Sequence, residues 1–317
     1  MSARSSAATR GPAVPDLFVP ESLDDAIGFL AEHAGSATPI AGGTDVMIDT
    51  RLGRVSPEWL VDLSRLGSLL DRQIDGEVLR LGALTTIRSV ELDPQLARRA
   101  AALVEAARVL GSVQIRTMAT IGGNLCHATP SAEMPPALLV HDAVAQTAGP
   151  GGERSMPLGE LFAGPGRTTL EPGELLTAVS LRVPASAAGS CYLRQTVRWS
   201  MDLAGVGVAA AVEVAGTTVT RARIALGAVA PVPLLVGEAA EAVVGTALSA
   251  EDADRAGACA AAACSPISDA RGTAEYRRQV VAVLVPRALR VSWLRATGSW
   301  PAGMPAPING VLSSDAP

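Results

Sequence analysis

Two glycine pairs flanked by hydroxyl and amide side chains are the residues best suited to chemistry in this chain of 317 residues. They lie in the runs Ala41-Gly42-Gly43-Thr44-Asp45 and Thr120-Ile121-Gly122-Gly123-Asn124. Glycine lacks a Cβ atom, so it can adopt φ > 0 and let successive backbone N–H groups face one concavity that binds an oxyanion. Two such turns could grip opposite sides of one pyrophosphate, with Thr and Asn side chains adding hydrogen bonds. Taken singly, either pair also fits a tight turn without a ligand.

A third glycine pattern is predicted to be structural. The run Gly205-Val206-Gly207-Val208-Ala209-Ala210 fits the loose G-x-G-x-x-A pattern of dinucleotide-binding turns. It lacks a clear preceding strand, continues into the strand-like Val212-Glu213-Val214, and has no acidic residue about 20 positions later. We therefore interpret it as a core strand and predict no nicotinamide-binding Rossmann fold.

The sequence offers no acid–base or metal-binding machinery of its own. No serine lies in a G-x-S-x-G context, and no carboxylate pair has a recognisable acid–base setting. His127, next to the second glycine pair, is predicted to make packing or solvent contacts. The four cysteines have no C-x-x-C spacing and the three histidines no ligand spacing, which disfavours a zinc or iron–sulfur site. Phosphate-binding turns without such machinery indicate that a bound cofactor carries out the chemistry.

Composition narrows the class of protein further. Hydrophobic residues make up 48% of the chain and charged residues 18%, which favours a folded protein with a sizeable core. A net charge of −5 and 3% aromatic residues argue against nucleic-acid binding. The apolar runs at 203–212 and 279–291 are shorter or more interrupted than the roughly 20 residues of a transmembrane helix. The first 15 residues lack the apolar region of a signal peptide, so we expect a cytoplasmic protein.

Periodicity and turn residues predict the elements that position the two glycine pairs. Helices are expected after an N-cap at Ser22, at 46–52, from Asp93-Pro94 to Gly111, and at 133–141. Strands are expected at 38–41, 58–63, 78–87 and 143–148, and 149–173 is expected to form loops around a helical piece at 158–162. The first glycine pair should therefore connect a strand to a helix.

The character of the chain changes after about residue 184. Antiparallel strands are predicted at 190–199, 204–215 and 217–229, followed by helices at 237–246, 251–264 and 273–295. Strands followed by helices indicate an α+β unit. The predicted organisation is a flexible N-terminus at 1–15, a domain of two subdomains at 16–183 that divides near residue 70, a C-terminal domain at 184–296, and a flexible tail at 297–317.

Several blocks in a fixed order carry a resemblance to a known family. They are Pro39 to Asp45, Thr117 to Asn124, Ala128 to Leu139, Gly164 to Leu170, Tyr192 to Ala204, Ile224 to Pro231, and Glu275 to Arg278. From about residue 16 to 295 the chain resembles the FAD-binding medium subunits of bacterial molybdenum hydroxylases. These include the flavoproteins of aerobic carbon monoxide dehydrogenases and the equivalent part of xanthine dehydrogenases.

The resemblance implies an α+β chain, in which a PCMH-type FAD-binding domain of two α/β subdomains precedes a domain of antiparallel sheet plus helices. It implies that the first glycine run wraps the pyrophosphate and that the second contributes phosphate and ribityl contacts, continued by Thr129 and Glu133. The block that contains Arg194 and Asp202 is implied to lie toward the isoalloxazine. Two positions depart from the family pattern, since Asp is more common at 133 and Lys at 194, which changes reach and donor geometry.

The function implied by the resemblance is electron transfer. A large molybdopterin subunit would oxidise the substrate, a small [2Fe-2S] subunit would pass electrons to FAD in this chain, and the assembly would be a dimer of heterotrimers. One alternative is a self-contained FAD-dependent oxidase or reductase, which needs a substrate-facing acid or base. Another is an interaction subunit that binds no cofactor. The sequence leaves open the organic substrate and the terminal electron acceptor.

Overall fold

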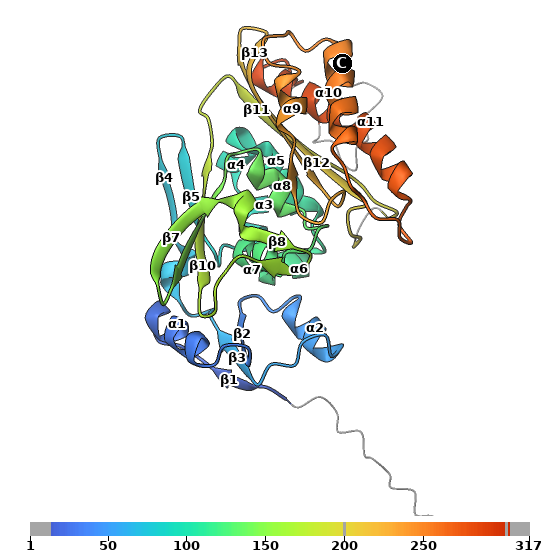
Figure 1. Ribbon diagram of the computed structural model, residues 1–317. Coiled ribbons are helices and arrows are strands. Elements are labelled where there is room, and N and C mark those ends of the chain that lie inside the picture. Colours follow the sequence, from blue (N-terminus) through green and yellow to red (C-terminus); the bar gives the residue numbers. More distant parts are fainter. Residues whose placement is uncertain (1–13, 199–200, 302–303, 305–317) are drawn as a thin grey trace, which may run out of the picture.

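The computed structural model describes residues 14–198, 201–301 and 304 (Figure 1). The flexible ends predicted at 1–15 and 297–317 lie largely outside these residues. The described residues form three larger sheets, of three, five and four strands, and a two-stranded sheet.

The first subdomain is a small parallel sheet with helices between its strands. Its strands β1 (Asp16–Phe18), β2 (Ala37–Ile40) and β3 (Trp59–Asp62) lie in the order β1-β3-β2. Helix α1 (Leu23–Glu32) begins as predicted, because the Ser22 side chain accepts a hydrogen bond from the Asp25 amide at 3.1 Å. Helix α2 (Val46–Arg51) follows β2, so the first glycine run does connect a strand to a helix.

The second subdomain is built on a five-stranded antiparallel sheet. Its strands, in spatial order, are β4 (Arg72–Asp75), β5 (Val78–Gly82), β10 (Leu175–Arg182), β6 (Val144–Gly149) and β7 (Gly152–Pro157). The antiparallel pairing makes this subdomain α+β, and the expectation of a second α/β subdomain is wrong. Strand β7 lies where loops were predicted. The strand predicted to reach residue 87 ends at Gly82, where a Cβ atom would lie 2.3 Å from the carbonyl oxygen of Leu69.

Short helices fill the rest of the second subdomain. They are α3 (Ile87–Glu91), α4 (Pro94–Arg99), α5 (Ala101–Val109), α6 (Val113–Met118), α7 (Ile121–His127) and α8 (Met134–Leu139). The 3₁₀ turns η1 (Gly67–Leu70) and η2 (Leu158–Leu161) and the hairpin β8 (Phe162–Gly164) to β9 (Arg167–Thr168) complete it. The single long helix predicted from Asp93 is wrong, because the backbone leaves helical geometry at Ala100 (φ −146°, ψ 55°) and separates α4 from α5.

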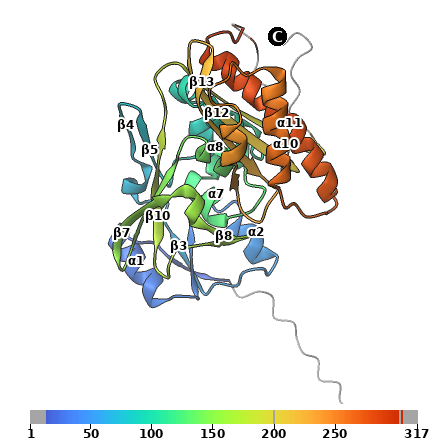
Figure 2. The ribbon, with the colours of Figure 1, turned by 45° about the horizontal axis from the view of Figure 1, so that its top comes forward.

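The C-terminal domain has the predicted antiparallel meander followed by helices. Its strands are β11 (Ala188–Gln195), β12 (Val206–Ala215), β13 (Thr218–Gly227) and the short β14 (Leu234–Leu235). Its helices are α9 (Gly237–Glu241), α10 (Ala250–Ala262) and α11 (Ala274–Ala296). Figures 1 and 2 show α10 and α11 over the outer face of this sheet, while α5 and α8 pack on its inner side.

The third glycine pattern runs into strand β12, as predicted, with Gly205 just before the strand and Val206 to Ala210 within it. A Cβ atom at Gly207 would lie 2.6 Å from the hydroxyl oxygen of Tyr192 on the neighbouring strand β11. At Gly205 a Cβ atom would lie 2.6 Å from the side-chain oxygen of Gln195. These glycines therefore make room for side chains of β11, which explains the pattern without a dinucleotide.

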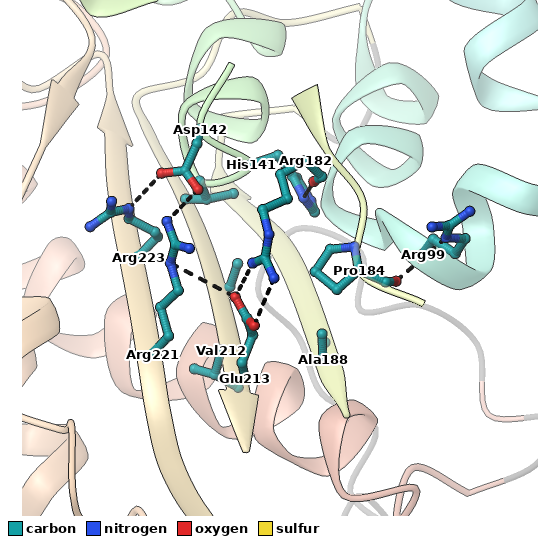
Figure 3. A pocket seen from close by; sticks show the side chains of 13 residues that line it. Arg99, His141, Asp142, Arg182, Pro184, Ala188, Val212, Glu213, Arg221 and Arg223 are labelled. Atoms are coloured by element: carbon teal, nitrogen blue, oxygen red, sulfur yellow. Dashed lines mark hydrogen bonds and ion pairs between the residues drawn. The ribbon is translucent and has the colours of Figure 1, made fainter. Parts of the chain in front are cut away.

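Ion pairs close a small cavity between the second subdomain and the C-terminal domain (Figure 3). Asp142 accepts from Arg221 at 2.5 Å and from Arg223 at 2.9 Å, both on β13. Arg182 on β10 pairs with Glu213 on β12 and with Glu77. These ion pairs therefore join the two domains. Because the charged groups around the cavity already pair with one another, the cavity is a poor ligand site.

Next to these ion pairs, two hydrogen bonds hold a neutral histidine ring in the junction between the domains. The ring of His141 is buried; its Nδ1 lies 2.9 Å from the carbonyl oxygen of Arg182, and its Nε2 lies 3.2 Å from the hydroxyl of Ser190. A carbonyl only accepts, so Nδ1 carries the proton and Nε2 accepts from Ser190. Burial lowers the pKa of His141 to about 4, because the charged ring would lose its hydration.

We expect His141 to make stability depend on pH between 6.5 and 4. The ordinary pKa is 6.5 and the folded value is about 4, so the unfolded chain binds the proton more readily within this window. The stabilisation is complete above pH 6.5 and declines as pH falls, by up to ~1.4 kcal/mol per pH unit. Urea unfolding of the parent and of His141→Gln across this range measures it. Equal slopes in both proteins would contradict the prediction.

Candidate functional site

The first glycine run forms a cradle of unpaired backbone amides between β2 and α2. Among the residues that the structure describes, no acceptor faces the amides of Gly42, Gly43, Thr44 or Asp45. Gly43 has φ +70°, the left-handed geometry that glycine adopts without strain. Four free N–H donors in succession fit an oxyanion such as a phosphate. The run therefore has the free donors that the predicted phosphate site requires, and phosphate binding by 41–45 stays a prediction.

The two glycine runs lie against each other, as predicted. A Cβ atom at Gly42 would lie only 1.8 Å from the carbonyl oxygen of Met118, the last residue of α6. Thr120 follows two residues later and begins the second run. Only glycine at position 42 permits this backbone contact, so its role is to bring the two subdomains together at the site.

The second run is the first turn of helix α7 and not a loop. All four amides from Ile121 to Asn124 donate to protein oxygens: those of Thr85, Ala83, the Thr120 side chain, and the Thr120 carbonyl. The expectation of a second backbone nest is therefore wrong. Gly122 is needed for a different reason, because a Cβ atom there would lie 2.8 Å from the Cβ of Ala83.

The second run still presents one unsatisfied polar atom. The Oδ1 atom of Asn124 is buried and has no hydrogen-bond partner among the residues that the structure describes. One helical turn later, the Nε2 atom of His127 lies 3.2 Å from Oδ2 of Asp49 in α2. Hydrogen bonds from Arg54 and His127 outweigh burial and lower the pKa of Asp49. Because Asn124 and His127 share a helix face, Asn124 also faces the first subdomain.

These groups fit FAD, a cofactor that combines a pyrophosphate with a hydroxyl-bearing ribityl chain. The amides of 42–45 would donate to phosphate oxygens, and Asn124 Oδ1 would accept from a hydroxyl. A buried acceptor without a partner is unfavourable by itself, so its presence points to a ligand donor.

Glu133 and Arg194 form a buried ion pair. Nη1 of Arg194, whose side chain is 1% exposed, lies 2.5 Å from Oε1 of Glu133, and the hydroxyl of Tyr192 donates to the same carboxylate. Burial raises the pKa of Glu133, and the Arg194 charge opposes that rise. The two departures from the family pattern are therefore partners in one contact. Direct contact of either side chain with the cofactor stays a prediction.

Asp202 closes the segment between β11 and β12. Its side chain accepts from the amides of Val197, Arg198 and Leu203, at 3.1, 2.8 and 3.0 Å. Burial acts to raise the pKa of Asp202, but these donors and Arg198 lower it below its ordinary value. Its carbonyl accepts from Arg194 at 3.2 Å, which links this segment to the buried pair. Thr129 is half-buried. Cofactor contacts by Thr129 and Asp202 stay predictions.

Exposed apolar side chains lie beside the cradle, and they were not predicted from the sequence. No residue of α2 is buried, and Met47 and Ile48 are 49% and 52% exposed. Met118 is 56% exposed beside Gly42. The apolar run Val46-Met47-Ile48 directly after Asp45 could have indicated them in the sequence. An exposed apolar face of this kind indicates a contact surface.

Comparison with known proteins decides the family. Residues 12–186 match the FAD-binding domain in molybdopterin dehydrogenase, and residues 191–291 match the CO dehydrogenase flavoprotein C-terminal domain. The chain belongs to this family of FAD-binding molybdenum hydroxylase subunits. It is an FAD-binding component of an oxidoreductase, as the resemblance implied.

Relatives cover nearly the whole molecule. The carbon monoxide dehydrogenase medium chain of Afipia carboxidovorans is 34% identical over 89% of this chain and 97% of its own length. A putative xanthine dehydrogenase FAD-binding subunit of Escherichia coli is 30% identical over 87% of this chain and 95% of its own. The structure of reconstituted CO dehydrogenase from Oligotropha carboxidovorans matches with a TM-score of 0.87 and 33% identity, over 90% of this chain and 99% of that chain.

These matches confirm the α+β class, with the FAD-binding domain followed by the C-terminal domain. The relatives are medium chains and subunits, so partner subunits are implied for this flavoprotein. Within the described part of the chain, no helix has both the length and the apolar character needed to cross a membrane.

Proposed function

We propose that this flavoprotein relays electrons within a molybdenum hydroxylase complex, accepting them from iron–sulfur centres of a partner and delivering them to an external acceptor. The observation that carries the proposal is the cradle of free amides at 42–45 beside the unpartnered Oδ1 of Asn124. These groups suit a bound cofactor, and the His–carboxylate contact beside them, His127 to Asp49, joins α7 to α2 and is assigned a positioning role. Binding FAD without processing an organic substrate is what a relay requires.

The chain's own residues bind and orient the cofactor. The amides of 42–45 would hold the diphosphate, and Asn124 would fix a ribityl hydroxyl. The Asp49–His127 contact would keep α2 against α7, so that the cradle and Asn124 stay together. Bound FAD supplies the redox chemistry, because it exchanges electrons singly or in pairs. In this proposal the side chains of the site position that chemistry, and none of them acts as a base toward a substrate carbon.

The proposed partners are a small [2Fe-2S] subunit and a large molybdopterin subunit, in a dimer of heterotrimers. Relatives named as medium chains and as FAD-binding subunits support a division of labour of this kind. The exposed Met47, Ile48 and Met118 offer apolar contacts next to the cofactor site, where a partner must approach for electron transfer. A cytoplasmic location is part of the proposal, and the four free thiols fit a reducing compartment.

An anaerobic titration of the isolated, FAD-loaded chain tests the relay. We expect carbon monoxide and xanthine, which the relatives' names suggest as trial substrates, to leave the visible flavin band unchanged. Dithionite should bleach the band, because it delivers electrons without a substrate pocket. The His127 ring is engaged by Asp49 between α7 and α2 and is assigned a positioning role, so we expect organic donors to have no route to the flavin.

The same titration on the native assembly provides the comparison. There, the substrate of the molybdenum subunit should bleach the flavin, and metal analysis should find molybdenum and iron together with this chain. Rapid bleaching of the isolated chain by an organic substrate would overturn the relay and favour a self-contained oxidase. If the native protein purified without molybdenum and without iron, that result would contradict the proposed partner subunits.

A further inference from the structure

A groove of about 420 Å³ lies away from the cofactor site, where α4 and α5 meet β11 and the end of α11. In Figure 1, α4 and α5 lie at the opposite end of the FAD-binding domain from α2. None of the residues that line the groove belongs to the cradle at 42–45 or to the run at 120–124. Its volume falls in the range of about 300–1,000 Å³ that is typical of small-molecule sites.

The groove carries an excess of positive charge. Its charged lining consists of the cations Arg98, Arg99, Arg108 and Arg295 and the anion Glu105. Glu105 is buried, and its carboxylate is used by Arg295 at 2.6 Å and by the Tyr192 amide at 2.8 Å. The single acid of the lining therefore balances Arg295, and no other lining carboxylate balances Arg98, Arg99 or Arg108.

Two of the remaining arginines are available to a ligand, and the third keeps part of its guanidinium free. Arg98 and Arg108 are exposed and have no hydrogen bond or ion pair among the described residues. Arg99 donates to backbone carbonyls, including that of Val183 at 2.5 Å, and to no described carboxylate. Figure 3 shows the Arg99 side chain beside Pro184, at the edge shared with the junction cavity. Three guanidinium groups around one concavity repel each other, and an anion between them would relieve that repulsion.

An aromatic wall limits the chemistry of the ligand further. The Trp300 ring lines the groove, with the Arg295 guanidinium 5.1 Å from its centroid. Guanidinium forks match phosphate oxygens in paired hydrogen bonds, and an indole adds apolar surface for a ring or sugar. We propose that this groove is a second ligand site that binds a phosphate-bearing anion of nucleotide size. This site lies apart from the two glycine runs. Both domains build it, because α4 and α5 belong to the FAD-binding domain and α11 belongs to the C-terminal domain.

Calorimetric titration of the full, FAD-loaded chain with pyrophosphate and with ADP tests the site. With FAD in place, the cradle at 42–45 cannot take up the probes. We expect saturable binding of one equivalent that weakens as salt is added, since exposed charges are screened. The double variant Arg98→Gln/Arg108→Gln should bind at least tenfold more weakly, with unchanged flavin content. Tighter binding of ADP than of pyrophosphate would show that the ring contributes, and equal binding would show recognition of the phosphates alone.

Arg65→Gln is the matched control, because Arg65 is also exposed, has no partner among the described residues, and lies outside the groove. It should bind both probes as the parent does. The proposal is overturned if the parent binds neither probe, if the double variant binds as tightly as the parent, or if Arg65→Gln loses as much affinity. Capture of a polyglutamate peptide without binding of either phosphate probe would also overturn it, by favouring an acidic partner segment.

Discussion

Replacing Gly42 with Ala is expected to weaken FAD binding at least tenfold, or ~1.4 kcal/mol or more. The added methyl group would lie 1.8 Å from the carbonyl oxygen of Met118, well inside van der Waals contact. Neither atom belongs to a movable side chain, so the overlap is relieved only if the backbones of 41–45 and 118–120 move apart. That movement separates the free amides from Asn124. Fluorescence titration of the apoprotein with FAD measures the affinity.

Gly28→Ala is the control for this substitution. Gly28 lies in α1 of the same subdomain, and a Cβ atom there would meet nothing within 4 Å. Alanine in a helix interior is more favourable than glycine by roughly 0.5–1 kcal/mol, so this variant should keep FAD and gain stability. If Gly42→Ala retained FAD as tightly as Gly28→Ala, the close approach of the two runs would be unimportant for the cofactor.

Glu133→Gln is expected to cause the largest loss of stability, roughly 3–5 kcal/mol. The substitution keeps the shape of the side chain and an acceptor for Tyr192, but it removes the negative charge that faces the buried Arg194. A guanidinium held in the interior without its countercharge is costly, because it has already lost its hydration. The free energy of unfolding in urea, measured without FAD, reports the effect on the protein alone.

The exposed pair of Arg255 and Asp252 provides the comparison for that loss. The Arg255 side chain is 52% exposed, so Arg255→Gln should cost no more than ~1 kcal/mol. If Glu133→Gln cost no more than this surface change, Glu133 would not be the countercharge that Arg194 needs. If Glu133→Gln lost stability but bound FAD normally, the Glu133–Arg194 pair would stabilise the fold without contacting the cofactor.

The convergence of the two glycine runs could be predicted from the sequence, but the way each run works could not. Both runs combine paired glycines with Thr and a polar amide or acid, and both read as turns. At Gly122 and Ile121 the amides find acceptors on Ala83 and Thr85, far away in the chain. Those tertiary hydrogen bonds extend a helix through residues of low helical propensity, and no local pattern shows them.

The Glu133–Arg194 contact was beyond the sequence for a similar reason. Each residue was noticed separately as a departure from the family pattern, yet 61 positions separate them in the chain. Pairing depends on how α8 packs against the sheet of β11 and β12, which is a property of the core. The strands and helices after residue 184 were predictable, because their alternation and turn residues are local.

Hydrogen bonds connect strand β11 to helix α5 of the preceding domain, and each element contributes a side chain to them. The hydroxyl of Ser190 accepts from the Ala102 amide at 3.1 Å, and Glu105 accepts from the Tyr192 amide. Arg295 in α11 donates to the Ser190 carbonyl and to Glu105. The change in pattern near residue 184 therefore coincides with a junction that buried polar contacts hold together. A chimera that joined the first half of one relative to the second half of another would have to inherit Glu105, Ser190 and Arg295 together, because a mismatched set would leave a buried charge at the seam.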